Sequence, residues 1–227
     1  MNILAFECSA KAASTALLSD GKLIAESFQN CGFTHSRTLL PLAESMLLGV
    51  GKTFEDIDIF ATSSGPGSFT GLRIGISLIK GLAYALDKPC VGISSLKAMA
   101  YLLPPSDSVL CAVMDARAGQ VYNALFDISS YEPKRLCEDR AITIENLTEE
   151  LHAIKRKVII IGDGAYLFDG KGFNDLPEYF RIQKASGVAF CAMESERYSP
   201  FQLTPAYHRL PQAERERIAK LKNTQGV

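Results

Sequence analysis

The sequence is poor in the residue clusters that mark metalloproteins and disulfide-rich proteins. Its 227 residues include three histidines, and its six cysteines form no C-x-x-C pair. We therefore expect no dedicated metal site, because metal sites need clustered ligands. The cysteines are scattered and several lie in apolar runs, which is typical of the reduced thiols of a cytoplasmic protein rather than of a disulfide framework.

Long apolar segments and a strong net charge are absent as well. No apolar stretch approaches the ~18 residues that a membrane-spanning helix needs, and the opening Met1–Glu7 has no basic segment of the kind that begins a signal peptide. Lys and Arg number 24 against 25 Asp and Glu. Neither a membrane partner nor a broad nucleic-acid surface on this chain alone is therefore expected.

The apolar pattern predicts an α/β protein of two related lobes. Hydrophobic residues make up 47% of the chain, which is enough for a real core at this length. By periodicity and turn signals, the expected strands are residues 2–7, 14–18, 22–28, 57–63, 90–93, 109–114, 120–127, 157–161 and 178–182. The expected helices are residues 36–50, 70–86, 94–103, 144–152, 187–197 and 213–222.

The order of these elements suggests where the chain divides. Hairpin strands followed by helix–strand alternation occur twice, and the strongest linker signal lies at Pro104–Ser108. We expect an N-terminal lobe of residues 1–104 and a smaller C-terminal lobe of residues 105–227. The 213–222 helix either stays with the second lobe or packs back on the first.

The most informative segment is the glycine-rich loop Gly65–Gly75, which follows an expected strand and opens a long helix. Amides at a helix N-terminus suit an anion, but the loop lacks the Lys of a Walker A motif and the third Gly of a dinucleotide fingerprint. Two interpretations stay open: glycines for a tight turn and close packing, or a loop that approaches a nucleotide or a partner backbone.

The two long helices at residues 36–50 and 70–86 carry wide apolar arcs. The arcs span about 160° and about 200°, against ~100° for a helix that buries one side. Either both helices are buried in their own lobe, or one face packs on the sheet while the adjoining face meets another subunit. The sequence alone does not choose between these interpretations.

Nucleophile candidates are weak. Cys8 and His35 could form the pair that a cysteine hydrolase requires, yet Cys8 ends an apolar strand, where lone cysteines are usually inert. Ser68 lacks the spacing of a nucleophile elbow. Asp115 and Arg117 end a strand, which is typical of a turn cap or a local salt bridge.

Several motifs occur together in an order found in one known family. They are Gly65–Gly75, Met114–Arg117 followed by Gln120–Tyr122, and Pro205–Arg209. With the opening Asn2–Ser9 they resemble the bacterial TsaB (YeaZ) family. The resemblance implies an actin-like ATPase fold, the ASKHA (ribonuclease H-like) architecture, with two duplicated lobes.

The resemblance also implies a role in tRNA modification. Family members are non-catalytic scaffold subunits required to make N6-threonylcarbamoyladenosine (t6A37) in tRNAs that read ANN codons. The implied partners are the catalytic paralogue TsaD, which this subunit would bind and activate, and the small ATPase TsaE, with tRNA reached through the complex. Alone, the chain could form a twofold homodimer. Alternatives to this function are an autonomous actin-like-fold kinase or a peptidase, and a pure protein-interaction module without a role in tRNA modification.

The family binds TsaD through helices of the first lobe, which locates the expected interface. The expected interface residues are His35, Leu39, Leu42, Met46, Phe69, Leu72, Arg73, Ile76, Ile79, Lys80 and Ala83. The expected nucleotide-proximal residues are Glu7, Ser9, Gly65, Gly67, Ser68, Gly162 and Gly164. No tightly bound cofactor is expected, and ATP or ADP at the interface with the partner is the alternative.

Two departures from the family patterns weaken chemistry in this chain. Many relatives have Asp-Thr-Ser at the end of the first strand, where this chain has Glu7-Cys8-Ser9. The resemblance places the metal-binding H-x-x-x-H of the catalytic paralogue at about Ser95 and Met99, which cannot replace two imidazoles. We therefore expect neither a catalytic residue nor a metal ligand.

Overall fold

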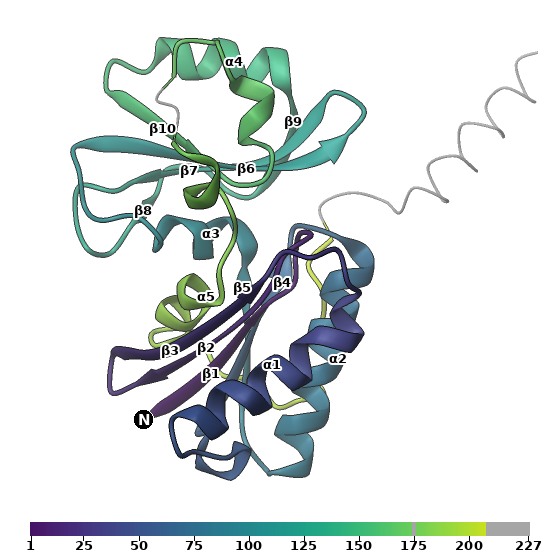
Figure 1. The fold of residues 1–227 in the computed structure, drawn as a ribbon. Coiled ribbons are helices and arrows are strands. Elements are labelled where there is room, and N and C mark those ends of the chain that lie inside the picture. The colour runs from purple at the N-terminus through teal and green to yellow at the C-terminus, as the bar shows by residue number, and fades with distance from the viewer. Residues whose placement is uncertain (174–175, 208–227) are drawn as a thin grey trace, which may run out of the picture.

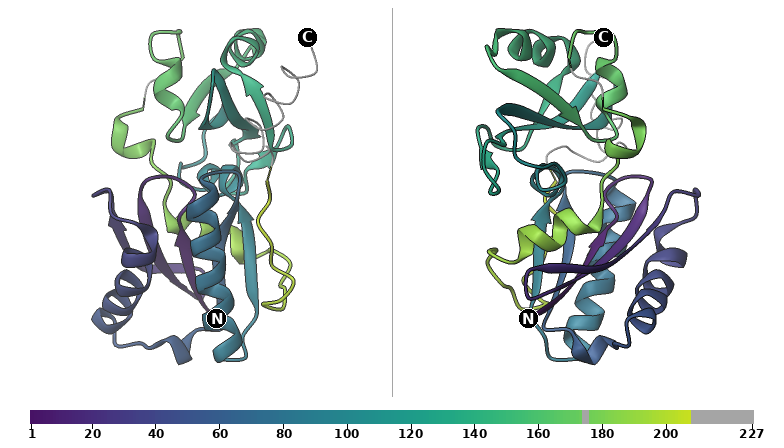
Figure 2. Two further views of the ribbon diagram at one scale, coloured as in Figure 1. Left: turned by 90° about the vertical axis from the view of Figure 1, so that its right-hand side faces the viewer. Right: turned by 60° about the vertical axis from the view of Figure 1, so that its left-hand side comes forward.

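The computed structural model describes residues 1–173 and 176–207, which form two α/β lobes lying one above the other in Figure 1. The first lobe contains β1 (Asn2–Glu7), β2 (Ala13–Ser19), β3 (Lys22–Gln29), α1 (His35–Gly49), the 3-10 turn η1 (Phe54–Asp56), β4 (Ile59–Gly65), α2 (Phe69–Ala85) and β5 (Cys90–Ser94). The second contains β6 (Ser108–Arg117), β7 (Gln120–Asp127), β8 (Lys134–Arg135), β9 (Arg140–Thr143), α4 (Ile144–Ala153), β10 (Lys157–Ile161) and η2 (Ala165–Phe168). Helices α3 (Ser95–Ala100) and α5 (Ala185–Ala192) lie between the two sheets (Figure 2).

The two sheets repeat one strand plan. The first has the order β3-β2-β1-β4-β5, and the second has the order β10-β6-β7-β8 with β9 beside β7. In the first sheet β1 pairs antiparallel with β2 and parallel with β4. In the second, β6 pairs antiparallel with β7 and parallel with β10. Strand β10 is therefore the counterpart of β4, and the expected duplication is confirmed.

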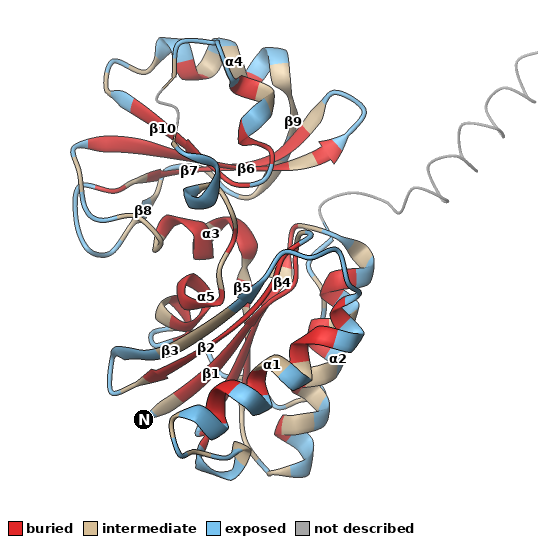
Figure 3. Cartoon of the chain, in the orientation of Figure 1, coloured by how far each residue is buried: buried red, intermediate tan, exposed pale blue. Residues whose placement is uncertain are grey.

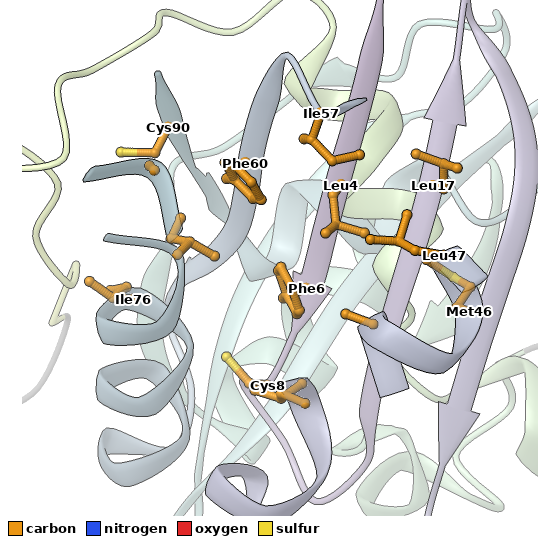
Figure 4. Close-up of a cluster of buried hydrophobic side chains, with 14 of the residues drawn as sticks. Leu4, Phe6, Cys8, Leu17, Met46, Leu47, Ile57, Phe60, Ile76 and Cys90 are labelled. Carbon is orange, nitrogen blue, oxygen red and sulfur yellow. The ribbon is translucent and has the colours of Figure 1, made fainter. Parts of the chain in front are cut away.

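Helices cover both faces of the first sheet. Helices α1 and α2 lie on one face, while α5 and part of α3 lie on the other, so the buried residues form stripes that face the sheet (Figure 3). Under α1 and α2, Phe6, Phe60 and Leu47 belong to one buried cluster between sheet and helices (Figure 4). Each such side chain contributes about 1.5–3 kcal/mol when it leaves water. Burial therefore fixes these two helices on the sheet.

Hydroxyl caps set the starts of the helices that follow β4 and β5. The Ser68 hydroxyl accepts a hydrogen bond from the amide of Gly71 at 3.2 Å. Ser94, the expected cap of the next helix, accepts one from the amide of Lys97 at 3.1 Å. Such caps satisfy amides that have no partner within the helix.

Among the helices of residues 1–173 and 176–207, none combines the length and the apolar character that a membrane span requires.

Some expected elements differ in the structure. Residues 178–182 do not form a strand; a 3-10 turn, η3 (Glu178–Phe180), follows Pro177, which cannot donate to a sheet ladder. The helix expected at 187–197 is α5, which ends at Ala192 where the apolar run gives way to exposed residues. The short strands β8 and β9 were not expected, because their charged residues interrupt the alternation of apolar and polar residues that predicts a strand. The 213–222 helix lies outside the described residues.

The end of the described chain returns to the first lobe. Helix α5 packs against β1 and β2, and its Val188 and Ala189 are fully buried there. Tyr198 then pairs with Cys90 of β5. Residues 185–207 therefore pack with the first lobe, which differs from the expected division at residue 105. The reason is that the first sheet has an apolar face that the N-terminal residues leave uncovered.

Candidate functional site

The glycine-rich loop is packed tightly against the first hairpin. Gly65 and Gly67 have φ of +131° and +155°, which disfavour any side chain. A Cβ at Gly67 would overlap the backbone of Ser9, and one at Gly65 would overlap the carbonyl of Ala206. The loop therefore approaches backbone of its own chain, and close packing accounts for these glycines.

Three amides at the start of α2 have acceptors within the chain. The Ser68 amide donates to the carbonyl of Ser9 at 2.7 Å. The Gly71 amide donates to the Ser68 hydroxyl, and the Leu72 amide donates to the Ser68 carbonyl at 2.9 Å. The amides of Ser68 and Gly71 are therefore not available to a phosphate, whereas those of Phe69 and Thr70 have no acceptor among the described residues. The loop thus offers only part of a helix start to a ligand.

Helix α2 also lies directly on the end of β1. A Cβ at Gly71 would overlap the carbonyl of Cys8, and one at Gly75 would overlap its thiol. Burial, together with the neighbouring Glu7 carboxylate, raises the pKa of the Cys8 thiol to about 12. The His35 ring does not activate this thiol, because its Nε2 donates to the carbonyl of Ala10 at 2.9 Å. The structure thus forms no Cys–His nucleophile.

Glu7 is a buried carboxyl group rather than an open catalytic acid. Its Oε1 accepts hydrogen bonds from the Ser9 amide at 2.6 Å and from the Ser63 hydroxyl at 3.1 Å. Burial raises the pKa of Glu7, and this effect outweighs the hydrogen bonds that lower it. Its Oε2 and the Ser9 hydroxyl have no hydrogen-bond partner among the described residues. The donors and charge here do not fit a phosphate chain.

The second lobe repeats this arrangement at Gly162 and Gly164. Gly162 has φ of +112°, and a Cβ there would overlap the carbonyl of Val113. A Cβ at Gly164 would lie 2.9 Å from the amide nitrogen of Asp115. The two glycines follow β10 as the glycine-rich loop follows β4. Their conformations are therefore explained by close packing on β6.

The structure gives structural roles to the remaining sequence candidates. Asp115 accepts hydrogen bonds from the Arg117 amide at 2.7 Å and from the Tyr166 hydroxyl at 3.1 Å, so it caps the β6–β7 turn. Ser95 and Met99, at the positions where the resemblance places the metal ligands of the catalytic paralogue, are buried. Within residues 1–173 and 176–207, no group of three or more His, Cys, Asp and Glu could hold a metal ion.

The structure corrects the expected partner interface. Six of its residues are at most 6% exposed and belong to the core or to the helix side that faces it: Leu39, Met46, Leu72, Ile76, Ile79 and Ala83. His35 is 9% exposed and contacts Gly71. The apolar arc of α2 is wider than its buried side, so the sequence did not indicate which side of α2 faces the sheet. A partner cannot reach these side chains, so a substitution at Ile76 would disturb the fold instead.

The surface that remains available is the outer face of α1 and α2. We define it by half-buried Leu42, Ile74, Leu78 and Leu82 together with exposed Leu48, Ser77 and Gly81. Leu48 is 80% exposed, which is high for such a side chain. Of the expected interface residues, Phe69 and Lys80 are half-buried at its margin and Arg73 is exposed. The spacing of Ser77 and Gly81 on a helix with apolar neighbours could have indicated this face.

A segment that the sequence did not predict lies beside α2. Residues 198–207, here called the C-terminal strap, run along β5 and α2 (Figure 2). Tyr198 exchanges backbone hydrogen bonds with Cys90 at 3.0 and 2.9 Å. The buried Leu203 accepts a hydrogen bond from the Lys80 ammonium group at 3.2 Å. The strap thus covers the edge of the first sheet and borders the outer face of α1 and α2.

Comparison with known proteins reveals both sequence and structural relatives. A family model described as TsaD, tRNA N6-adenosine threonylcarbamoyltransferase, matches residues 29–171. The tRNA threonylcarbamoyladenosine biosynthesis protein TsaB of Bacillus subtilis is 30% identical over 230 residues, covering 98% of this chain and 100% of that protein. TsaB of Escherichia coli is 40% identical over 125 residues, covering 54% of this chain and 53% of that protein.

Among solved structures, a Pseudomonas aeruginosa protein described as similar to the peptidase YeaZ superposes with a TM-score of 0.77 at 25% identity. The match covers 92% of this chain and 99% of that one. A dehydratase activator from Clostridium difficile, solved with bound ADPNP, superposes with a TM-score of 0.50 at 12% identity over 86% of this chain and 95% of that one. These likenesses show the actin-like ATPase fold.

Proposed function

Since the chain carries a TsaD-type domain and belongs to the TsaB family, we propose that it is a non-catalytic subunit of the system that makes threonylcarbamoyladenosine in tRNA. In this proposal it binds and activates TsaD, which forms t6A37 in tRNAs that read ANN codons. The small ATPase TsaE joins the pair, and tRNA is contacted through the complex. The chain works in the cytoplasm.

The packing of the glycine-rich loop is the observation that supports a non-catalytic role. Two donors at the start of α2, the amides of Ser68 and Gly71, are bound by Ser9 and Ser68 of the same chain. The neighbouring Glu7 is buried, and its pKa is raised. An actin-like kinase would need open phosphate donors and an ionised acid at these places. The chain instead uses the same residues to hold α2 on the sheet.

The outer face of α1 and α2 is the surface we propose for TsaD. Half-buried Ile74, Leu78 and Leu82 supply apolar contact, and exposed Ser77 and Gly81 let a partner helix approach closely. Without TsaD, the same surface pairs two copies into a twofold dimer. Any ATP or ADP binds between the subunits, because two of the loop's donors within this lobe are already bound.

Reconstitution tests the proposed function directly. Purified TsaD, TsaE, the threonylcarbamoyl-AMP synthase and unmodified tRNA are combined with and without this chain, and modified adenosine is quantified by mass spectrometry. We expect modification to depend on the chain, and the chain alone to hydrolyse neither ATP nor peptides. Full modification without the chain contradicts the proposal. Turnover of ATP or peptide by the purified chain would instead favour an autonomous kinase or peptidase.

A further inference from the structure

Arg73 stands on the first turns of α2 and is held in place by the C-terminal strap. Its Nε donates a hydrogen bond to the Tyr207 hydroxyl at 2.8 Å, and the centre of its guanidinium lies 5.7 Å from the centroid of the Tyr207 ring. The Tyr207 ring in turn stacks on Phe69 with centroids 4.6 Å apart. An arginine that is oriented in advance loses less conformational entropy when it binds.

These contacts engage one side of the guanidinium group. Arg73 is exposed, and among the described residues no hydrogen bond or ion pair occupies its two Nη groups. The Nη pair forms a planar fork that matches the two oxygens of a carboxylate. The geometry therefore leaves an oriented, charged donor pair at the margin of the outer face of α1 and α2.

The charge of the two helices specifies what should meet this fork. Helices α1 and α2 contain the cations Arg37, Arg73 and Lys80 but a single carboxylate, Glu44. A complementary partner surface is therefore acidic. Because the adjacent Ile74 and Leu78 are half-buried and apolar, the surroundings suit a protein surface with a core of apolar contacts and a charged margin.

The local backbone argues against a phosphate as the bound anion. Phosphate sites at helix starts combine basic side chains with free amides. Here the Gly71 amide donates to the Ser68 hydroxyl, and at the helix start only the amides of Phe69 and Thr70 have no acceptor among the described residues. A phosphate at the fork of Arg73 would therefore meet fewer backbone donors than usually complete such a site.

We infer that Arg73 binds the carboxylate of an acidic side chain on the TsaD partner, and that Tyr207 of the C-terminal strap positions it. This inference rests on the proposed function. The strap is then part of the docking surface as well as a cover for the sheet edge. Arg73 acts by direct contact, and Tyr207 acts through Arg73.

Titration calorimetry of the full chain with TsaD from the same organism tests this inference. Arg73→Glu should weaken binding by about 100-fold or more, since it replaces an oriented charge pair by like-charge repulsion. Arg73→Lys keeps the charge but loses the fork, and should weaken binding by about 10-fold. The matched control is Arg197→Glu, which changes an exposed arginine that contacts Met1 and should have no effect.

The role of Tyr207 has its own test. Tyr207→Phe keeps the ring but removes the hydroxyl that orients Arg73, and should weaken binding by about 3- to 10-fold with an unchanged melting temperature. In an Arg73→Met background the same change should have no further effect, because the two residues act as a coupled pair. A Tyr207→Phe effect that persists in that background overturns the positioning role.

The outcomes separate this inference from the function on which it rests. If the wild-type chain does not bind TsaD, the proposed function fails and the inference fails with it. If the wild type binds but Arg73→Glu binds as tightly as Arg197→Glu, the inference alone is wrong. If Arg73→Glu abolishes ADP binding while TsaD affinity is unchanged, the anion is a phosphate and the carboxylate assignment is overturned.

Discussion

The two lobes share a strand plan but differ in the segment that comes after the parallel strand. After β4 the chain forms α2, a helix of 17 residues, whereas after β10 it forms the 3-10 turn η2 of 4 residues. The first sheet therefore carries two long helices side by side, and the second carries α4 of 10 residues on the corresponding side. The docking face that we propose therefore lies in the lobe that has the second long helix, and the difference between the lobes locates it better than the shared topology does.

The glycines that follow β4 and β10, in contrast, have the same role in both lobes. Gly67 packs on Ser9 after β1, and Gly164 packs on Asp115 at the end of β6. Since the second lobe shows the same device at the equivalent strand, close packing accounts for the glycine-rich loop without a ligand. Variants at matched positions in the two lobes, or on the two sides of one helix, test this comparison.

The largest expected effect concerns the inner side of α2. Ile76 is 4% exposed in the core of the first lobe, so Ile76→Glu should destabilise the protein by about 5 kcal/mol because it buries an unpaired charge. Ser77→Glu changes the next residue, which is exposed, and should change the free energy of unfolding by no more than about 0.5 kcal/mol. Urea unfolding measures both. Equal stabilities would contradict the orientation of α2.

The next effect compares the glycines of the two lobes. Gly67→Ala meets both a positive φ and the backbone of Ser9, and should cost about 3–4 kcal/mol. Gly164→Ala meets the amide of Asp115 at 2.9 Å without a positive φ, and should cost about 1–2 kcal/mol. Thermal unfolding ranks them. The reverse order would show that the loop of the first lobe is less tightly packed than described.

A smaller effect concerns the pH dependence of stability, which we compare for one carboxyl group in each lobe. Burial raises the pKa of Glu7 above its ordinary value of 4.5. Above pH 4.5 the unfolded chain therefore releases this proton before the folded chain does, and Glu7 lowers stability progressively until the pH passes its raised pKa. In the second lobe, hydrogen bonds from Arg156 lower the pKa of Asp127, so its contribution is present above its ordinary value of 3.8 and is lost as the pH falls below it.

Unfolding in urea across pH 3–8 measures this difference. Glu7→Gln retains an Oε1 acceptor for Ser9 and Ser63, and should remove the loss of stability above pH 4.5. Asp127→Asn should leave that loss intact and remove part of the loss at acid pH instead. A wild-type decline above pH 4.5 that persists unchanged in Glu7→Gln would contradict the buried, proton-retaining state of Glu7.

The smallest effect concerns two exposed glycines. A Cβ at Gly81 on α2 meets nothing within 4 Å, so Gly81→Ala should raise stability by about 0.5–1 kcal/mol through helix propensity. Gly119 in the β6–β7 turn is equally open but has φ of +69°, so Gly119→Ala should lower stability by about 1 kcal/mol. Melting temperatures that shift in the same direction would contradict this contrast.

Much of the fold could be predicted from the local pattern of the sequence. Strands β7 and β10 have the expected bounds, and Ser94 caps its helix as expected, because period, turn residues and caps act over a few neighbouring residues. The phase of α2 could not be predicted. Its apolar residues extend over more than the buried side, so the sequence pattern distinguishes no single face. The expectation that Ile76 meets a partner is wrong, because Ile76 belongs to the core.

The strap and the return of α5 could not be predicted for a different reason. They depend on contacts between residues far apart in the sequence, such as Tyr207 with Arg73 and Val188 with the first sheet. Nothing in the local composition of residues 185–207 reports which lobe they cover. Which segment covers an apolar face depends on which faces the rest of the fold leaves uncovered. Contacts of this kind are therefore seen in the three-dimensional structure and not in the local sequence.

The most direct test of the central claim is the affinity of TsaD for a chain whose outer face is obstructed without harm to the fold. Gly81→Arg adds a long side chain where nothing lies within 4 Å, while Glu149→Arg adds one on the exposed side of α4 in the second lobe. We predict that Gly81→Arg weakens TsaD binding by about 100-fold or more and that Glu149→Arg binds as the wild type does, both with unchanged stability or better. Normal binding by Gly81→Arg together with loss of binding by Glu149→Arg would contradict the claim that the first lobe alone carries the docking face.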